Sequence, residues 1–253
     1  RLDDSETKEM LSKTYPYTIL ITEDDDEVRG FLERELSLHF KIRTVANGKD
    51  ALRVLEEEEI SLVVSDVMMP EMNGFELCRT IKSQLPFSHI SVILLTALTD
   101  ERQRIFGITG GADDYIQKPF HTDYVKIKII HLLQERQKLR ERLLEKLRDN
   151  KLLLSEPEKV ESIDDTFLRK FAEQIEAVYA DPEYNVEKLS ETLGLSRGHL
   201  HRKIKELTGT APVEFLRTYR LNKATQLLRQ NAYTVSEVAY RTGFSSPAYF
   251  SKC

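Results

Sequence analysis

Short apolar runs alternate with amphipathic segments through the first half of the chain, and this alternation restricts the fold more than any other feature. Five runs have the length and β-branched composition of buried strands, at residues 17–22, 40–45, 60–65, 90–95 and 114–117. Segments with helical spacing follow them, beginning near residues 28, 51, 74, 100 and 122. Repeated strand–helix units predict a parallel five-stranded sheet with helices on both faces.

Polar residues stand where these predicted strands end. The first strand runs into the acidic residues 23–26, the third ends at Asp66, and the fourth ends at Thr96. Lys118 follows the fifth strand and precedes Pro119, and we expect a cis peptide bond between them. Because the carboxyl ends of parallel strands lie along one edge of a sheet, these groups are expected to converge.

Carboxylates that converge repel one another unless a cation lies between them. Glu23, Asp24 and Asp66 offer only oxygen ligands, and such a set favours Mg²⁺ or Mn²⁺. We expect the backbone carbonyl of Met68 to add a further ligand. Asp25 and Asp26 are expected to be solvated acids at a helix start rather than ligands.

Asp66 is placed to act as a nucleophile. A carboxylate can attack phosphorus and form an aspartyl phosphate. Thr96 and Lys118 would then neutralise and hydrogen-bond the phosphoryl oxygens, so these three residues are the predicted catalytic set. The alternative is that Asp66 is only a turn residue, and the convergence of the other strand ends argues against it.

Residues 17–134 resemble the receiver domain of two-component response regulators, which has a flavodoxin-like α/β fold. The resemblance rests on residues 19–24, 66–70, 73–74, 96–97 and 115–120. Glu23 stands where such domains more often carry Asp. The resemblance implies that Asp66 receives phosphate from the phosphohistidine of a histidine kinase. It also implies that Thr96 and Tyr115 change position together on phosphorylation, with Tyr115 moving inward.

A charged helical connector is predicted after the receiver domain, within residues 135–163. Val125, Ile129, Leu132, Leu139 and Leu143 form a short heptad series in which Arg136 takes one apolar position. Two structures fit this pattern, a parallel two-stranded coiled coil and a solvated single helix. Residues 1–16 are predicted to be an N-terminal arm or linker.

The last part of the chain differs from the first in charge. From Asp181 onward there are eleven Lys/Arg and seven Asp/Glu, a net charge of +4, whereas the whole chain carries −5. Residues 186–207 read as a helix, a turn with Gly194 and a basic second helix, which is helix-turn-helix spacing. The pattern recurs about 49 residues later, at residues 235–245. Two such motifs in tandem predict an all-α unit that reads two major-groove segments of double-stranded DNA.

Residues 164–253 resemble the AraC-type DNA-binding domain, and residues 209–212 and 219–224 strengthen the likeness. The sequence stops at Cys253, inside the expected second recognition helix, and we therefore expect it to lack the last helix usual in this family. Arg202 is the best candidate for a base contact, because Arg can bind guanine through two hydrogen bonds. Lys203 and Lys205 are expected to touch phosphate or solvent, and His199 to turn inward. The predicted DNA-binding residues are Gly198, His201, Arg202, Lys203, Lys205, Pro247, Ala248, Ser251 and Lys252.

These features predict a phosphorylation-controlled transcription regulator. We expect no enzymatic activity beyond self-phosphotransfer at Asp66, a homodimer when phosphorylated, and a cytoplasmic location without membrane contact. The domain order also resembles the C-terminal part of hybrid two-component sensors, in which the kinase precedes both domains and an inner-membrane segment lies upstream. One alternative is a phosphohydrolase with an Asp nucleophile, but its general acid would stand at Met68. Another is a scaffold with an inert receiver, against which the full set of acids, Thr96 and Lys118 argues.

Overall fold

The computed structural model of the chain describes residues 9–97, 111–148 and 162–253, with the backbone alone for 142–148. The chain divides into two compact units, Arg1–Lys138 and Leu139–Cys253. The helix predicted at residues 100–109 and the link around Asn150, Ser155 and Pro157 lie outside the described residues. No helix within the described ranges combines the length and apolar character that a membrane crossing requires.

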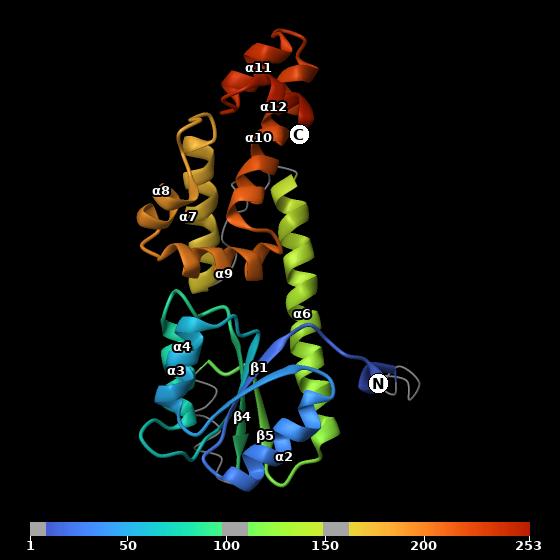
Figure 1. Cartoon of the computed structure of the whole chain (residues 1–253), viewed down its shortest axis with the longest axis vertical. Helices are drawn as coiled ribbons and strands as arrows, with labels where there is room; N and C mark the ends of the chain where they lie inside the picture. The colour runs from blue at the N-terminus through green and yellow to red at the C-terminus, as the bar shows by residue number, and fades with distance from the viewer. Residues whose placement is uncertain (1–8, 98–110, 149–161) are drawn as a thin grey trace. The chain divides into compact units, whose positions relative to one another are not determined.

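The first unit is built on a parallel five-stranded sheet, as the sequence predicts, and the structure gives the strand order β2-β1-β3-β4-β5 (Figure 1). Its strands are β1 (Thr18–Thr22), β2 (Lys41–Val45), β3 (Leu62–Asp66), β4 (Ser91–Thr96) and β5 (Asp114–Gln117). Its helices are α2 (Asp26–Ser37), α3 (Gly48–Glu57), α4 (Gly74–Ser83) and α6 (Thr122–Arg148), which begins in this unit. This arrangement is the flavodoxin-like receiver fold.

Alternate residues of each central strand face opposite layers of helices. Ile19, Ile21, Leu62 and Val64 pack with α2 and α6, whereas Leu20 and Val63 pack with α3 and α4. β3 is buried along its whole length, which explains why its sequence is apolar rather than alternating. Because the strands are parallel, they end at the same edge of the sheet, and the packed core on both faces holds the side chains at their ends in place.

The N-terminal segment is attached to this unit from residue 9 onward. Met10 and Tyr15 pack against the core beside α2, and the Tyr15 ring stacks on Phe40 with centroids 5.5 Å apart. The Tyr15 N–H donates to the His39 carbonyl at 2.7 Å. The described part of the predicted arm thus covers the surface next to β2.

Apolar residues of α6 pack into the core of the first unit, which the heptad pattern did not indicate. Val125 and Ile129 are fully buried in the receiver core, and Leu132 packs against it. The Arg136 guanidinium donates to the Ser61 carbonyl at 3.1 Å. Val125 and Ile129 are therefore not free to form a coiled-coil seam, because they cover the sheet. Leu139 is 55% exposed, and the side chain of Leu143 lies outside the described residues.

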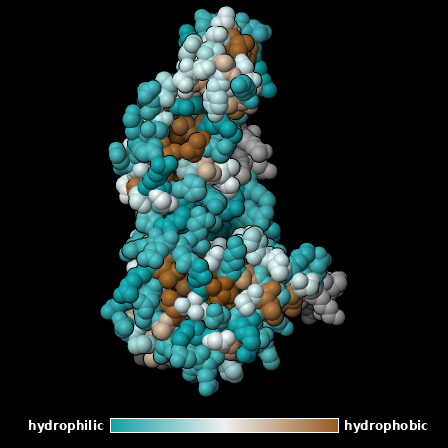
Figure 2. All heavy atoms as spheres, in the orientation of Figure 1, coloured by the Kyte–Doolittle hydropathy of each residue, from teal (hydrophilic) through white to brown (hydrophobic). Residues whose placement is uncertain are grey.

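The second unit is helical, as predicted. It contains α7 (Ile163–Val178), α8 (Val186–Thr192), α9 (Arg197–Thr208), α10 (Pro212–Arg229), α11 (Val235–Arg241) and α12 (Pro247–Lys252). The helix-turn-helix pairs are α8–α9 and α11–α12, and α10 connects them (Figure 1). Phe171 is buried against Phe215, with ring centroids 4.9 Å apart. Apolar side chains reach the visible surface of both units only in small patches (Figure 2).

Candidate functional site

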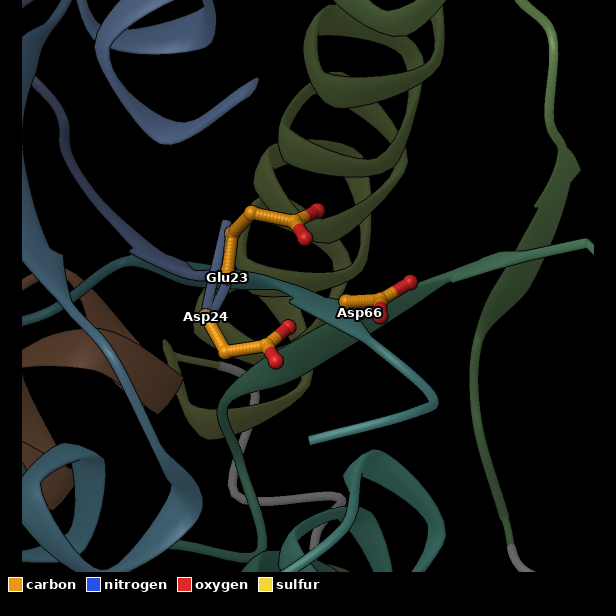
Figure 3. A group of neighbouring side chains, drawn as sticks. All are labelled: Glu23, Asp24 and Asp66. Atoms are coloured by element: carbon orange, nitrogen blue, oxygen red, sulfur yellow. The ribbon is translucent and has the colours of Figure 1, made fainter. Parts of the chain in front are cut away.

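The acidic residues after β1 and the end of β3 form one cluster at the carboxyl edge of the sheet. One carboxylate oxygen from each of Glu23, Asp24 and Asp66 lies within 4.8 Å of the other two. Figure 3 shows the three side chains as close neighbours. Glu23 and Asp66 are buried, whereas Asp24 is exposed and leaves the cluster open to solvent.

Lys118 joins the two buried carboxylates. Its Nζ lies 2.8 Å from Glu23 Oε2 and 2.8 Å from Asp66 Oδ1. Burial opposes the charged form of Lys118, but its hydrogen bonds to Asp66 and Glu23 outweigh burial and hold the pKa of Lys118 above its usual value. Burial raises the pKa of Glu23, against the opposing hydrogen bond from Lys118. The Lys118–Pro119 peptide bond is cis, as expected.

The loop after β3 is held close to the phosphoacceptor candidate. The Met68 N–H donates to Asp66 Oδ2 at 3.1 Å, while the Met68 side chain is 67% exposed. Gly74 closes the loop by donating to the Val67 carbonyl at 3.0 Å. A Cβ at Gly74 would lie only 2.2 Å from the Asp66 carbonyl oxygen, so the loop requires glycine here. The Met68 carbonyl as a metal ligand stays a prediction.

Thr96 lies on β4, the strand next to β3, and Tyr115 lies on β5, the edge strand that pairs with β4. Thr96 is buried at the end of β4, and its carbonyl accepts the Lys118 N–H at 2.8 Å. Tyr115 points inward, with its hydroxyl buried and no hydrogen-bond partner among the described residues. Burial, reinforced by Cys78 and Asp113, raises the pKa of Tyr115 to about 12. A coordinated change of Thr96 and Tyr115 on phosphorylation stays a prediction.

Sequence reasoning missed one residue that shapes the acidic turn. The Arg29 guanidinium donates to the Glu23 carbonyl at 2.7 Å and the Asp24 carbonyl at 3.3 Å, and it also pairs with Asp26. Asp25 caps α2 by accepting the N–H groups of residues 27 and 28. The position of Arg29 one helical turn after Asp26 was the available signal. Asp25 and Asp26 are exposed, as expected.

The donor set of the cluster fits a hard divalent cation. All its side-chain ligands are carboxylate oxygens, and they lie close enough for one ion to contact all three. The buried Glu23 and Asp66 carry charge that Lys118 alone does not balance. Glu23, Asp24 and Asp66 would therefore hold Mg²⁺ or Mn²⁺, as the sequence predicts.

In the helical unit, most of the predicted DNA-binding residues lie at the surface. Arg202 and Pro247 are half-buried. His199, predicted to turn inward, is half-buried as well, with its Nε2 atom shielded from solvent. The exposed members of the predicted set are Gly198, His201, Lys205, Ala248, Ser251 and Lys252.

Lys203 does not belong to this surface, and the prediction that it touches phosphate or solvent is wrong. Its side chain is 0% exposed, its Nζ lies 2.5 Å from Asp164 Oδ1, and it stands over the Phe167 ring at 5.2 Å. Lys203 thus lies on the face of α9 that packs against α7. The charge is stabilised there because Asp164 and an aromatic face replace water.

Comparisons with known proteins agree with this geometry. Residues 19–130 match the response regulator receiver domain family, and residues 189–253 match a helix-turn-helix domain family. Histidine kinase P4 of Formosa agariphila is 37% identical over 252 residues, which are 100% of this chain and 18% of that protein. The transcriptional regulatory protein GltR of Pseudomonas aeruginosa is 43% identical over 121 residues, or 47% of this chain and 50% of GltR.

A solved structure is also similar to the first unit. It is the receiver domain of a signal transduction histidine kinase from Syntrophus aciditrophicus, 38% identical, with a TM-score of 0.45. The match covers 47% of this chain and 91% of that one. Together, the two family matches and the residues of the site identify the chain as a response regulator receiver domain followed by a helix-turn-helix domain of the AraC type.

Proposed function

We propose that the chain is a phosphorylation-controlled transcription regulator in which Asp66 accepts a phosphoryl group and thereby controls DNA binding by the helical unit. The observation that carries the proposal is the bridge from Lys118 to both Glu23 and Asp66, with Asp24 beside them. This arrangement brings together a buried nucleophile, the Asp66 carboxylate, the ammonium group of Lys118 and a set of oxygen ligands.

The transfer reaction follows from this arrangement. An Asp66 carboxylate oxygen attacks the phosphorus of a phosphohistidine, the P–N bond breaks, and its electron pair returns to the imidazole of the kinase. Lys118 lies 2.8 Å from Asp66 Oδ1 and can neutralise charge on the phosphoryl oxygens. A divalent ion held by the three carboxylates would supply further charge neutralisation. The chain acts on itself and carries no other enzymatic activity.

The domain order supports an output on DNA. The relatives named above are a histidine kinase and a transcriptional regulator, and the alignment with the kinase runs along the full length of this chain. The chain is accordingly proposed to be the C-terminal part of a hybrid histidine kinase that phosphorylates it within one polypeptide or dimer. Phosphorylation would favour a homodimer on double-stranded DNA. The protein would act in the cytoplasm, where its DNA target lies.

The phosphohydrolase alternative has less support. A leaving group would need a proton donor two residues after the nucleophile, and Met68 at that position is apolar and exposed. The inert-scaffold alternative does not explain why Lys118 pairs with two buried carboxylates.

Intact-mass measurement tests the acceptor. The full chain is incubated with Mg²⁺ and acetyl phosphate beside the Asp66→Asn variant and a receiver domain of known activity. The proposal expects a phosphoryl mass gain in the wild type. The gain should be absent from Asp66→Asn, and it should not occur in the wild type when EDTA is present from the start. A gain of equal size in Asp66→Asn would refute Asp66 as the acceptor. No gain in the wild type, with labelling of the control receiver, would favour the inert scaffold.

A further inference from the structure

A groove of about 290 Å³ lies between the two helix-turn-helix pairs of the second unit. One side comes from α8 and from the first residue of α9, and the other from the turn before α12 and from α12 itself. Residues of α10 line it between them. The groove thus lies between the first turns of the two predicted recognition helices. The lining residues that matter here are Arg197, Val213, Arg217, Arg220, Phe244 and Tyr249.

The groove is cationic. Three arginines line it, against the single acid Glu187. Arg197 pairs with Glu187 at 2.7 Å, with the two side chains 71% and 49% exposed. Arg217 pairs with Glu214 at 2.5 Å, with the two side chains 43% and 50% exposed. Ion pairs between exposed side chains stabilise a protein only weakly, so either arginine can change partner to an incoming anion at small cost.

Arg220 has a different role, because it holds the walls together. It donates to the Tyr179 carbonyl at 2.8 Å and the Asp181 carbonyl at 2.7 Å, both in the segment after α7. Gly243, in the turn of the second helix-turn-helix, lies against the same groups. A Cβ there would be 2.1 Å from the Tyr179 oxygen and 2.9 Å from Arg220 Nε. Arg220 therefore links α10 to the segment before α8, and the turn at Gly243 packs directly against this link, so Arg220 positions two sides of the groove.

The position of the groove indicates its occupant. Two recognition helices that enter successive major-groove segments leave a stretch of sugar–phosphate backbone between them. Arginine is the side chain best suited to phosphate, and phosphate contacts set the register of a protein on DNA. We propose that this groove seats the DNA backbone between the two major-groove segments, with Arg197 and Arg217 as phosphate ligands and Arg220 as a positioning residue. The inference rests on the proposed function of the unit in DNA binding.

Salt dependence of binding tests the ligands. A duplex is first selected from random DNA with the phosphorylated full-length chain, and affinity is then measured by fluorescence anisotropy at several salt concentrations. Arg197→Ala and Arg217→Ala are compared with Arg229→Ala, an exposed arginine of α10 outside the groove. Each groove variant is expected to weaken binding several-fold and lower the log–log salt slope by about 1, whereas Arg229→Ala leaves the slope unchanged.

Neutral methylphosphonate linkages place the contact on the DNA. We expect that neutralising one particular linkage between the half-sites weakens DNA binding by the wild type several-fold. The same neutralised linkage should not weaken DNA binding by Arg217→Ala any further. Salt slopes equal to that of Arg229→Ala, or equal losses at every linkage in wild type and variant, would overturn the inference while leaving DNA binding intact. If the wild type selects and binds no duplex, the proposed function itself fails and the inference falls with it. Unchanged circular dichroism confirms that each variant is folded.

Discussion

Gly74→Ala tests whether the backbone behind Asp66 tolerates any added atom. An ideal Cβ at Gly74 would lie 2.2 Å from the Asp66 carbonyl oxygen, 3.0 Å from its carbonyl carbon and 3.0 Å from Val67 Cα. Ordinary contact begins at 3.4 Å, so α4 and the end of β3 must separate by roughly 1 Å. The obstructing atoms are backbone, and no side-chain rotation can relieve the contact.

The expected magnitude follows from two opposing effects. Alanine at a helical position gains about 0.5–1 kcal/mol over glycine, whereas overpacking against a fixed backbone costs about 1–3 kcal/mol or more. The free energy of unfolding should therefore fall by up to about 2.5 kcal/mol. Displacement of Asp66 should also slow phosphoryl incorporation from acetyl phosphate, because the nucleophile no longer lies at its distance from Lys118.

Gly30→Ala is the matched control. Gly30 is exposed within α2, and a Cβ there meets no described atom within 4 Å. The same chemical change should raise the free energy of unfolding by about 0.5–1 kcal/mol and leave phosphorylation unchanged. Urea unfolding followed by circular dichroism and intact mass over time give both quantities. A Gly74→Ala variant as stable and as rapidly phosphorylated as Gly30→Ala would refute the reasoning.

Three further predictions concern the packed interior. Phe171→Ala should lower the stability of the helical unit by about 3–5 kcal/mol in urea unfolding, because it opens a cavity beside Phe215. Lys203→Ala should lower the stability of the helical unit more than Lys203→Met, because methionine keeps the buried apolar stem. Neither substitution should change the salt slope of DNA binding, and a lower slope would restore the prediction that Lys203 touches phosphate. Burial raises the pKa of Cys78 to about 11, so only about one thiol in a thousand is ionised at pH 8. Its labelling should therefore rise about tenfold per pH unit and lag far behind the exposed Cys253, and equal rates at pH 8 would contradict this.

The receiver unit was largely predictable from the sequence, because its signals are local. The run from Leu62 to Asp66 is apolar because β3 is buried on both faces, and strand ends must meet at one edge of a parallel sheet. That geometric rule was enough to predict that residues as far apart as Glu23, Asp66 and Lys118 would lie together. The inward position of Tyr115 and the hydrogen bonds from Arg29 depend on packing that no local pattern reports.

Sequence reasoning left one question open and made one error, each where one pattern has two physical causes. The spacing of Val125 and Ile129 suits a coiled-coil seam and a helix that covers a sheet equally well, and only the sheet decides between them. Lys203 was read as exposed because lysine usually is, but it follows Leu200 on the inner face of α9. Its partner Asp164 lies 39 residues away, a distance at which sequence spacing carries no information about pairing.

DNA affinity with and without phosphorylation tests the central claim most directly. The selected duplex is titrated with the full chain, wild type and Asp66→Asn, each with Mg²⁺ and with or without acetyl phosphate. The account predicts that acetyl phosphate changes the affinity of the wild type at least several-fold and leaves Asp66→Asn unchanged. If the wild type is phosphorylated at Asp66 by intact mass and its affinity for DNA does not change, phosphorylation does not control DNA binding and the account is wrong.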